Sequence, residues 1–165
     1  MQLSQFNHQP IREQLEHCVK IPRWADEISA KRPFESRQAV LDFAEQQAKT
    51  WTWEEILHAL NTHPRIGEKK AQASLSAKEQ QFSAREQAQA QTDQATLDLI
   101  LQGNLEYETR FGYIFLIKAA GLSSTEILAA LHSRLKHDPI TEQQMVKQQL
   151  MAIALLRLEQ ELEHD

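Results

Sequence analysis

The feature that most constrains the fold of this chain is a helix-start pattern that recurs along it. In each copy, a Ser or Thr is followed three positions later by Glu or Gln. This is the capping box, in which each side chain binds the backbone N–H of the other residue. Four copies stand at expected helix starts, and they begin at Thr52, Ser83, Ser123 and Thr141. Strand patterns are weak by comparison, because the chain has only three valines and no long apolar–polar alternation. The sequence therefore predicts an all-α protein.

Apolar spacing and helix-breaking residues indicate where the first helices lie. A helix over residues 36–49 would turn Val40 inward and Gln47 toward solvent. The next helix should end near Asn61 or Thr62, because the residue before Pro64 is disfavoured in the helical conformation.

The second half of the chain follows the same logic. The helix that starts at Ser83 is expected to stop at Gly103, and the last helix is expected to start at Thr141. The apolar run at residues 111–117 fits either the start of a buried helix or an extended segment. Together these features predict one domain over residues 1–165, a helical bundle of about seven to nine helices.

The composition narrows the class of protein. The 165 residues can form one core without metal or disulfide support. With 18 Lys and Arg against 23 Asp and Glu, the net charge of −5 argues against a nucleic-acid partner. The single cysteine, Cys18, suits a reducing compartment. No apolar run approaches the roughly 20 residues that span a bilayer, and the N-terminus lacks a signal-peptide layout. We therefore expect a cytoplasmic protein with no membrane partner.

His63 is the first candidate for catalysis. It stands directly before Pro64 at an expected helix end, where an imidazolium would meet the negative end of the helix dipole. The same position could instead hold an imidazole in one orientation for acid–base work. Gly67, four residues later, can adopt a positive φ and keep this segment tight. The residues alone leave both roles open.

Glu86 is the candidate partner of His63. As the last residue of the Ser83 capping box, it can simply bind the Ser83 amide. A carboxylate at a helix N-terminus is also held ionised by the dipole and could orient a histidine. Arg157 interrupts an apolar series in the last helix, so its guanidinium either reaches the surface or points into a polar pocket.

Other kinds of site find less support. Glu55-x-x-His58 and Glu161-x-x-His164 have the spacing of di-iron bundles, which also need two further inward glutamates. The sequence has no glycine-rich phosphate loop, no dinucleotide fingerprint and no nucleophile elbow. We therefore expect no metal. A cofactor-free acid–base enzyme and a non-catalytic helical binding module remain, with a di-iron bundle as a further rival.

Several sequence blocks are informative as a set. In chain order they are Trp24-Ala, Arg32-Pro-Phe34, Trp53-x-Glu55, His63-Pro-Arg-Ile-Gly67, Ser83-x-x-Glu86-Gln87, Asn104-x-x-Tyr107-x-x-Arg110-Phe-Gly112, Phe115-Leu-Ile, Gly121, Arg134-Leu, Glu142 and Leu156-Arg157-Leu158. In combination they resemble the 2-oxo-4-hydroxy-4-carboxy-5-ureidoimidazoline (OHCU) decarboxylases of urate breakdown. Three places depart from that family, and one of them is the glutamine-rich segment Ala71 to Gln81, which is longer or looser than usual. His137 stands where the family often has Asn, and Cys18-Val-Lys20 stands where it often has Cys-Gly-Ser.

The resemblance implies an all-helical enzyme, often a homodimer, that removes CO2 from OHCU to give (S)-allantoin without a metal or an organic cofactor. When CO2 leaves the carbinol carbon of OHCU, the electron pair can enter the adjacent C=N bond of the ring. The protein then need only orient the substrate, exclude water and handle protons. A related ureide as the substrate stays open.

The resemblance also assigns roles to residues. His63 would exchange a proton with the substrate hydroxyl or the new carbon centre. Glu86 would orient His63 or bind the ureido N–H groups. Arg157, with Arg134 as the alternative, would hold a substrate oxygen in a forked contact. His63 and Glu86 are thus the expected catalytic residues. The expected substrate-binding residues are Pro64, Ser83, Gln87, Phe111, Gly112, Phe115, Leu116, Ile117 and Arg157.

Overall fold

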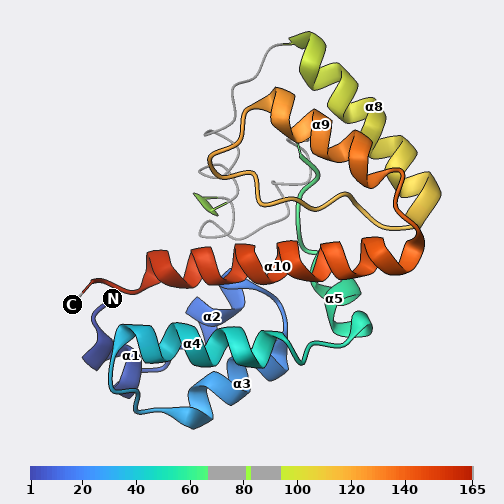
Figure 1. Ribbon diagram of the computed structural model, residues 1–165. Coiled ribbons are helices and arrows are strands. Elements are labelled where there is room, and N and C mark those ends of the chain that lie inside the picture. The colour runs from blue at the N-terminus through green and yellow to red at the C-terminus, as the bar shows by residue number, and fades with distance from the viewer. Residues whose placement is uncertain (67–80, 83–93, 165) are drawn as a thin grey trace. The chain divides into compact units, whose positions relative to one another are not determined.

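The computed structural model describes residues 1–66, 81–82 and 94–164. Within these ranges the chain forms eight α-helices and no β-strand (Figure 1). The helices are α1 (Leu3–His8), α2 (Arg12–Cys18), α3 (Pro22–Lys31), α4 (Arg37–Ala48), α5 (Trp53–Leu60), α8 (Gln94–Phe111), α9 (Ser124–Arg134) and α10 (Pro139–Glu161). The all-α prediction is confirmed. None of the helices in the described ranges is both long and apolar enough to cross a membrane.

The chain divides into two compact units. The first unit comprises residues 1–59 and 150–165, and the second comprises residues 60–149. Buried apolar side chains fill each of them. A single domain over residues 1–165 stays a prediction.

Trp24 lies in the core of the first unit and is fully buried. Its indole Nε1 donates to the carbonyl oxygen of Ala44 at 3.1 Å, and its ring meets the ring of Trp51 edge-on. The Trp51 indole donates in turn to the side-chain oxygen of Gln47 at 2.9 Å. Gln47 is buried beside this indole, so its predicted orientation toward solvent was wrong. The indole makes burial tolerable because it satisfies the amide oxygen.

Two of the four capping boxes form as predicted. At the start of α5, the Glu55 N–H donates to Thr52 Oγ1 at 3.2 Å and the Thr52 N–H donates to Glu55 Oε1 at 2.9 Å. At the start of α9, Ser123 and Glu126 exchange the same two bonds, both at 3.1 Å. α5 ends at Leu60, one or two residues before the expected end at Asn61 or Thr62.

The last helix starts earlier than expected. α10 begins at Pro139, and the Asp138 carboxylate accepts hydrogen bonds from the backbone N–H and the hydroxyl of Thr141, at 2.9 and 2.8 Å. The predicted start at Thr141 was wrong, because an Asp cap followed by Pro is itself a strong start signal. The predicted start at Ser83 lies outside the described residues.

In the second unit, α8 and α9 lie side by side (Figure 1). Gly103 is buried within α8, and a Cβ at this position would lie 2.4 Å from Cδ2 of Leu131 in α9. The missing side chain thus permits the close approach of the two helices. The predicted helix stop at Gly103 was wrong, because tertiary packing outweighs the low helix propensity of glycine here.

The segment after α8 resolves the ambiguity at residues 111–117. α8 ends at Phe111, and Gly112 has a left-handed φ of +84°. Residues 113–119 then continue without helix or strand. Phe115 and Ile117 turn their side chains into the core of the second unit, which also contains Ile100, Tyr107, Ala119, Ile127 and Leu131.

Candidate active site

The histidine loop, defined as residues 63–66, follows the end of α5 in the chain. The backbone N–H of His63 donates to the carbonyl oxygen of Leu60 at 3.1 Å, so the loop leaves the helix through a tight turn. The His63 side chain is partly buried and Pro64 is buried. Ile66 packs against the core of the second unit. The loop is therefore packed against that core through Ile66, and the His63 imidazole keeps part of its surface open to solvent.

Two residues of α8 hold the other end of the histidine loop. Arg65 makes a forked contact with Glu108, with Nε 2.9 Å from Oε2 and Nη2 2.7 Å from Oε1. Asn104 Nδ2 donates to the carbonyl oxygen of Ile66 at 3.2 Å. Positions 104 and 108 are one helical turn apart and share a face of α8. Both contacts therefore attach the loop to the same helix face.

The backbone segment, defined as residues 112–117, is held from its buried side. Arg134 Nη1 donates to the carbonyl oxygen of Leu116 at 2.5 Å, and the guanidinium lies 4.4 Å from the ring centroid of Phe115. Leu116 is itself buried. The backbone N–H groups of a segment held in this way are fixed in direction, as groups that bind a ring carbonyl would need to be.

A buried polar cluster surrounds Glu142, which has no exposed surface. Arg134 donates to Glu142 Oε2 through Nε at 3.0 Å and through Nη2 at 2.7 Å. The Tyr107 hydroxyl donates to the same oxygen, and His137 Nδ1 lies 3.0 Å from Oε1. Burial, and then the hydrogen bond to Glu142, raise the pKa of the Tyr107 hydroxyl above its usual range, which keeps it a donor. The guanidinium of Arg134 is thus engaged by a carboxylate, a carbonyl and a ring.

Sequence reasoning did not predict this cluster, although it named three of its members as parts of family blocks. The helical spacing of the buried positions could have revealed it. Arg134 continues the buried positions Ile127 and Leu131 of α9 at helical spacing, and Glu142 begins the buried series Glu142, Val146 and Leu150 of α10. A charged residue on the buried face of a helix requires a partner. Two such residues of opposite charge on neighbouring helices are therefore expected to form an ion pair.

The remaining expected site residues fall into two groups. Arg157 belongs to the first unit, where it is buried and Nη1 donates to the carbonyl oxygen of Cys18 at 3.4 Å. Ser83, Glu86 and Gln87 lie outside the described residues. Within the second unit, the structure brings together the histidine loop and residues 111–117, because Ile66, Phe111 and Phe115 contribute to one core.

Glu55, the first residue of one proposed di-iron pair, is engaged by an arginine. Arg23 Nη2 lies 2.9 Å from Glu55 Oε1, and Arg23 Nε lies 3.2 Å from Oε2. The hydrogen bond from Arg23 lowers the pKa of the Glu55 carboxyl below its ordinary value. His58 is exposed. Among the described residues, no three His, Cys, Asp or Glu side chains gather in a group that could hold a metal ion.

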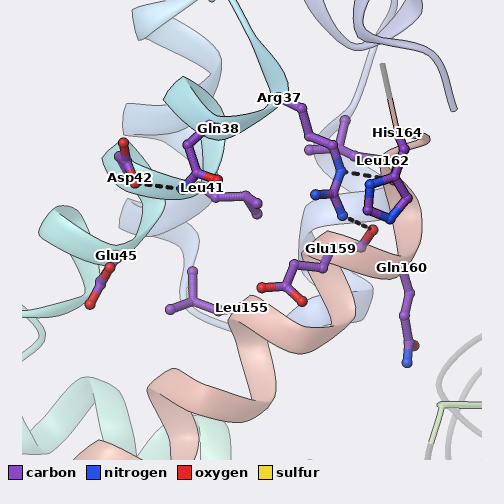
Figure 2. A pocket seen from close by; sticks show the side chains of 10 residues that line it. All are labelled: Arg37, Gln38, Leu41, Asp42, Glu45, Leu155, Glu159, Gln160, Leu162 and His164. Atoms are coloured by element: carbon purple, nitrogen blue, oxygen red, sulfur yellow. Dashed lines mark hydrogen bonds between the residues drawn. The ribbon is translucent and has the colours of Figure 1, made fainter.

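Each unit contains a surface cavity, and neither includes a predicted site residue. In the first unit, a groove of about 530 Å³ between α4 and the end of α10 is lined by Arg37, Gln38, Leu41, Asp42, Glu45, Leu155, Glu159, Gln160, Leu162 and His164 (Figure 2). Arg37 is occupied there by the carbonyl oxygens of Glu159 and Leu162, at 2.9 and 3.2 Å. In the second unit, a cavity of about 690 Å³ lies beside the contact between Arg65 and Glu108.

Comparison with known proteins identifies relatives over almost the whole chain. A sequence model of the family described as OHCU decarboxylase matches residues 4–159. The chain is 30% identical over 146 residues to the uric acid degradation bifunctional protein TTL of Arabidopsis thaliana, covering 86% of this chain and 44% of that protein. It is 29% identical over 157 residues to the uric acid degradation bifunctional protein PucL of Bacillus subtilis (strain 168), covering 94% and 31%. The chain thus spans less than half the length of these two relatives.

Relatives of similar length and solved structures agree with this. The 2-oxo-4-hydroxy-4-carboxy-5-ureidoimidazoline decarboxylase of Haloferax volcanii is 26% identical over 140 residues, covering 83% of this chain and 79% of that protein. A crystal structure of OHCU decarboxylase in the presence of (S)-allantoin superposes with a TM-score of 0.73 at 25% identity, covering 90% of this chain and 96% of the other. A crystal structure of (S)-allantoin synthase shares the fold, with a TM-score of 0.69 at 19% identity, covering 98% of this chain and 54% of the other.

Proposed function

The chain belongs to the OHCU decarboxylase family, and from this membership we propose that it converts OHCU to (S)-allantoin in urate breakdown. One structural observation supports the proposal most. Ile66 of the histidine loop and Phe115 of the backbone segment pack into the same core of the second unit. An acid–base group and a set of fixed backbone amides, the two elements that this reaction needs from the protein, therefore belong to one compact part of the chain.

The chemistry sets modest demands on the protein. Loss of CO2 breaks the bond between the carboxylate and the carbinol carbon, and the electron pair moves into the adjacent C=N bond of the ring. Because the substrate supplies its own electron sink, the reaction can proceed without a metal or an organic cofactor. The enzyme accelerates it by orienting OHCU, excluding water and delivering a proton to one face of the new carbon centre. Delivery to one face gives the (S) product.

The roles of individual residues are proposals. His63 exchanges the proton, and Pro64 shapes the wall beside it. Amides of the backbone segment after Gly112 bind the ring carbonyls, because the Gly112 N–H already donates to the carbonyl oxygen of Glu108. Arg157 holds a substrate oxygen in a forked contact. The engagement of Arg134 within the buried cluster supports Arg157 for this task.

The part of the site outside the described residues carries further proposed roles. Glu86, with Ser83 and Gln87 beside it, orients His63 or binds the ureido N–H groups of the substrate. Two properties of the whole protein are proposed from the resemblance, namely assembly as a homodimer and location in the cytoplasm. Cys18 is the single cysteine of the sequence and its thiol is buried, which is compatible with a reducing compartment.

OHCU also loses CO2 slowly without an enzyme and then gives racemic allantoin, so the test compares both the rate and the optical activity of the product. OHCU is generated in situ from urate, and circular dichroism follows the optical activity of the allantoin that forms. We expect (S)-allantoin to accumulate faster than in the absence of the protein, and the His63→Ala variant to lose most of this effect. Optically inactive product at the uncatalysed rate would reject the proposal and favour a related ureide as substrate or a helical binding module.

A further inference from the structure

We propose that Arg65, Glu108 and Asn104 are positioning residues of the active site, which hold the imidazole of His63 in place relative to the backbone segment. This inference rests on the proposed function and extends it to three residues with no assigned role. All three residues take part in the contact between α8 and the histidine loop. Glu108 and Asn104 lie on α8, and both contact the histidine loop two or three residues after His63.

The histidine loop needs such contacts. Residues 63–66 form neither helix nor strand, so no backbone ladder fixes their path beyond the turn at Leu60. Side-chain contacts therefore decide where the loop lies. The fork between Arg65 and Glu108 has two roughly parallel bonds, at 2.9 and 2.7 Å, and two such bonds restrict rotation as well as distance.

The helix that receives these contacts is itself firmly held. Between Asn104 and Glu108 lies Tyr107, which is buried and donates to Glu142. Gly103, next to Asn104, packs closely against Leu131 of α9. The attachment points of the loop thus lie beside two residues of α8 that are fixed by contacts with other helices.

The same helix leads directly into the backbone segment. α8 ends at Phe111, one residue before Gly112. One rigid element therefore carries both the anchors of the histidine loop and the start of the segment proposed to bind the ring carbonyls. Loss of an anchor should change the position of His63 relative to that segment, and a shift of about 1 Å in a reacting group can cost about 100-fold in rate.

Stability alone is a weak explanation for the fork. The side chains of Arg65 and Glu108 keep 41% and 22% of their surface exposed, and exposed ion pairs contribute little to folding. The chain also offers a matched control in the first unit. Arg23 and Glu55 form a fork with similar geometry, at 2.9 and 3.2 Å, and with 39% and 23% exposure.

The experiment compares Arg65→Lys and Glu108→Gln with the control variant Arg23→Lys in the full chain. At a temperature where every variant is folded, we expect the first two to lower kcat by about 10- to 100-fold while KM for OHCU changes less than about threefold. Arg23→Lys should retain the kcat of the unmodified protein. Arg65→Lys with an unchanged kcat would overturn the inference.

A double-mutant cycle tests whether Arg65 acts through His63. In the His63→Ala background there is no imidazole to position, so Arg65→Lys should change the remaining rate by less than about twofold. An equally large loss with and without His63 would show that Arg65 does not act through the histidine, and would overturn the inference.

A measurement without substrate separates this inference from the proposed function. The imidazole signals of isotope-labelled histidine, with His63 assigned through His63→Ala, should shift in Arg65→Lys and stay unchanged in Arg23→Lys. If the unmodified protein left OHCU to react at the uncatalysed rate, the proposed function would fail and these signals would decide the positioning role. A His63 signal that is identical in all three proteins would then reject it.

Discussion

Arg134 directs two of its guanidinium nitrogens, Nε and Nη2, at one carboxylate oxygen of Glu142, 3.0 and 2.7 Å away, at a site with almost no access to water. The third nitrogen, Nη1, donates to the carbonyl oxygen of Leu116. This arrangement ties together the end of α9, the first turn of α10 and the backbone segment. The buried charge pair thus helps to hold the backbone segment of the candidate site in position.

Breaking the Arg134–Glu142 pair from one side should be costly. Arg134→Met leaves the Glu142 carboxylate buried without its cation, and we expect the free energy of unfolding to fall by about 3–5 kcal/mol, measured by urea denaturation. The double variant Arg134→Met/Glu142→Leu should recover at least half of that loss, because it removes both charges. A single variant that loses less than about 1 kcal/mol would contradict the structural role given to the pair.

Gly103 should not tolerate a methyl group. Alanine has the higher helix propensity and on that ground alone would stabilise α8. Its Cβ would lie 2.4 Å from Leu131 Cδ2, so we expect Gly103→Ala to lower the free energy of unfolding by about 1–3 kcal/mol. Leu131→Val in the same chain should relieve part of this loss. Stabilisation by Gly103→Ala would show that α8 and α9 are not packed as closely as described.

His63 should be required for turnover and dispensable for folding. Acid–base groups commonly contribute about 10²- to 10⁴-fold to rate, and we expect His63→Gln to lower kcat within this range. The imidazole is only partly buried, so the thermal unfolding midpoint should change little. Near-normal turnover of a folded His63→Gln enzyme would remove the proposed catalytic role.

Glu86 has two candidate roles that predict different losses. If the carboxylate orients His63 or binds the substrate, Glu86→Gln should reduce turnover by more than about tenfold with little change in the thermal midpoint. If it serves mainly as the partner of Ser83 in a capping box, stability should fall together with activity. Steady-state kinetics and thermal unfolding of the same preparation distinguish the two.

Glu55 should contribute a pH-dependent component of stability. The hydrogen bond from Arg23 lowers its pKa in the folded protein below the ordinary value of 4.5. A depressed carboxyl pKa stabilises the fold fully above the unfolded value, and this contribution is lost as the pH falls through the folded value. Urea midpoints between pH 7 and pH 3 should therefore fall less steeply for Glu55→Gln than for the unmodified protein. Arg23→Met should flatten the same curve, because it removes the cause of the shift.

Local sequence signals determined most of the secondary structure. The capping boxes at Thr52 and Ser123 could be predicted because the two residues that exchange hydrogen bonds are only three positions apart. Their interaction therefore depends on little beyond the local chain. The same reasoning failed at Thr141, where a second local signal, Asp138 followed by Pro139, was the stronger one. The histidine loop was also anticipated, since Pro64 limits the helix before it.

The tertiary structure decided everything that depends on distant partners. Gly103 looks like a helix stop until Leu131, from another helix, lies against it. Gln47 looks solvent-facing until the Trp51 indole reaches its oxygen. Tyr107 and Glu142 meet across 35 positions, and Arg65 and Glu108 across 43. Hydrophobic periodicity predicts which face of a helix is buried. Which side chain of another helix contacts that face depends on how the helices pack. That packing therefore decides which residues hold the candidate site together.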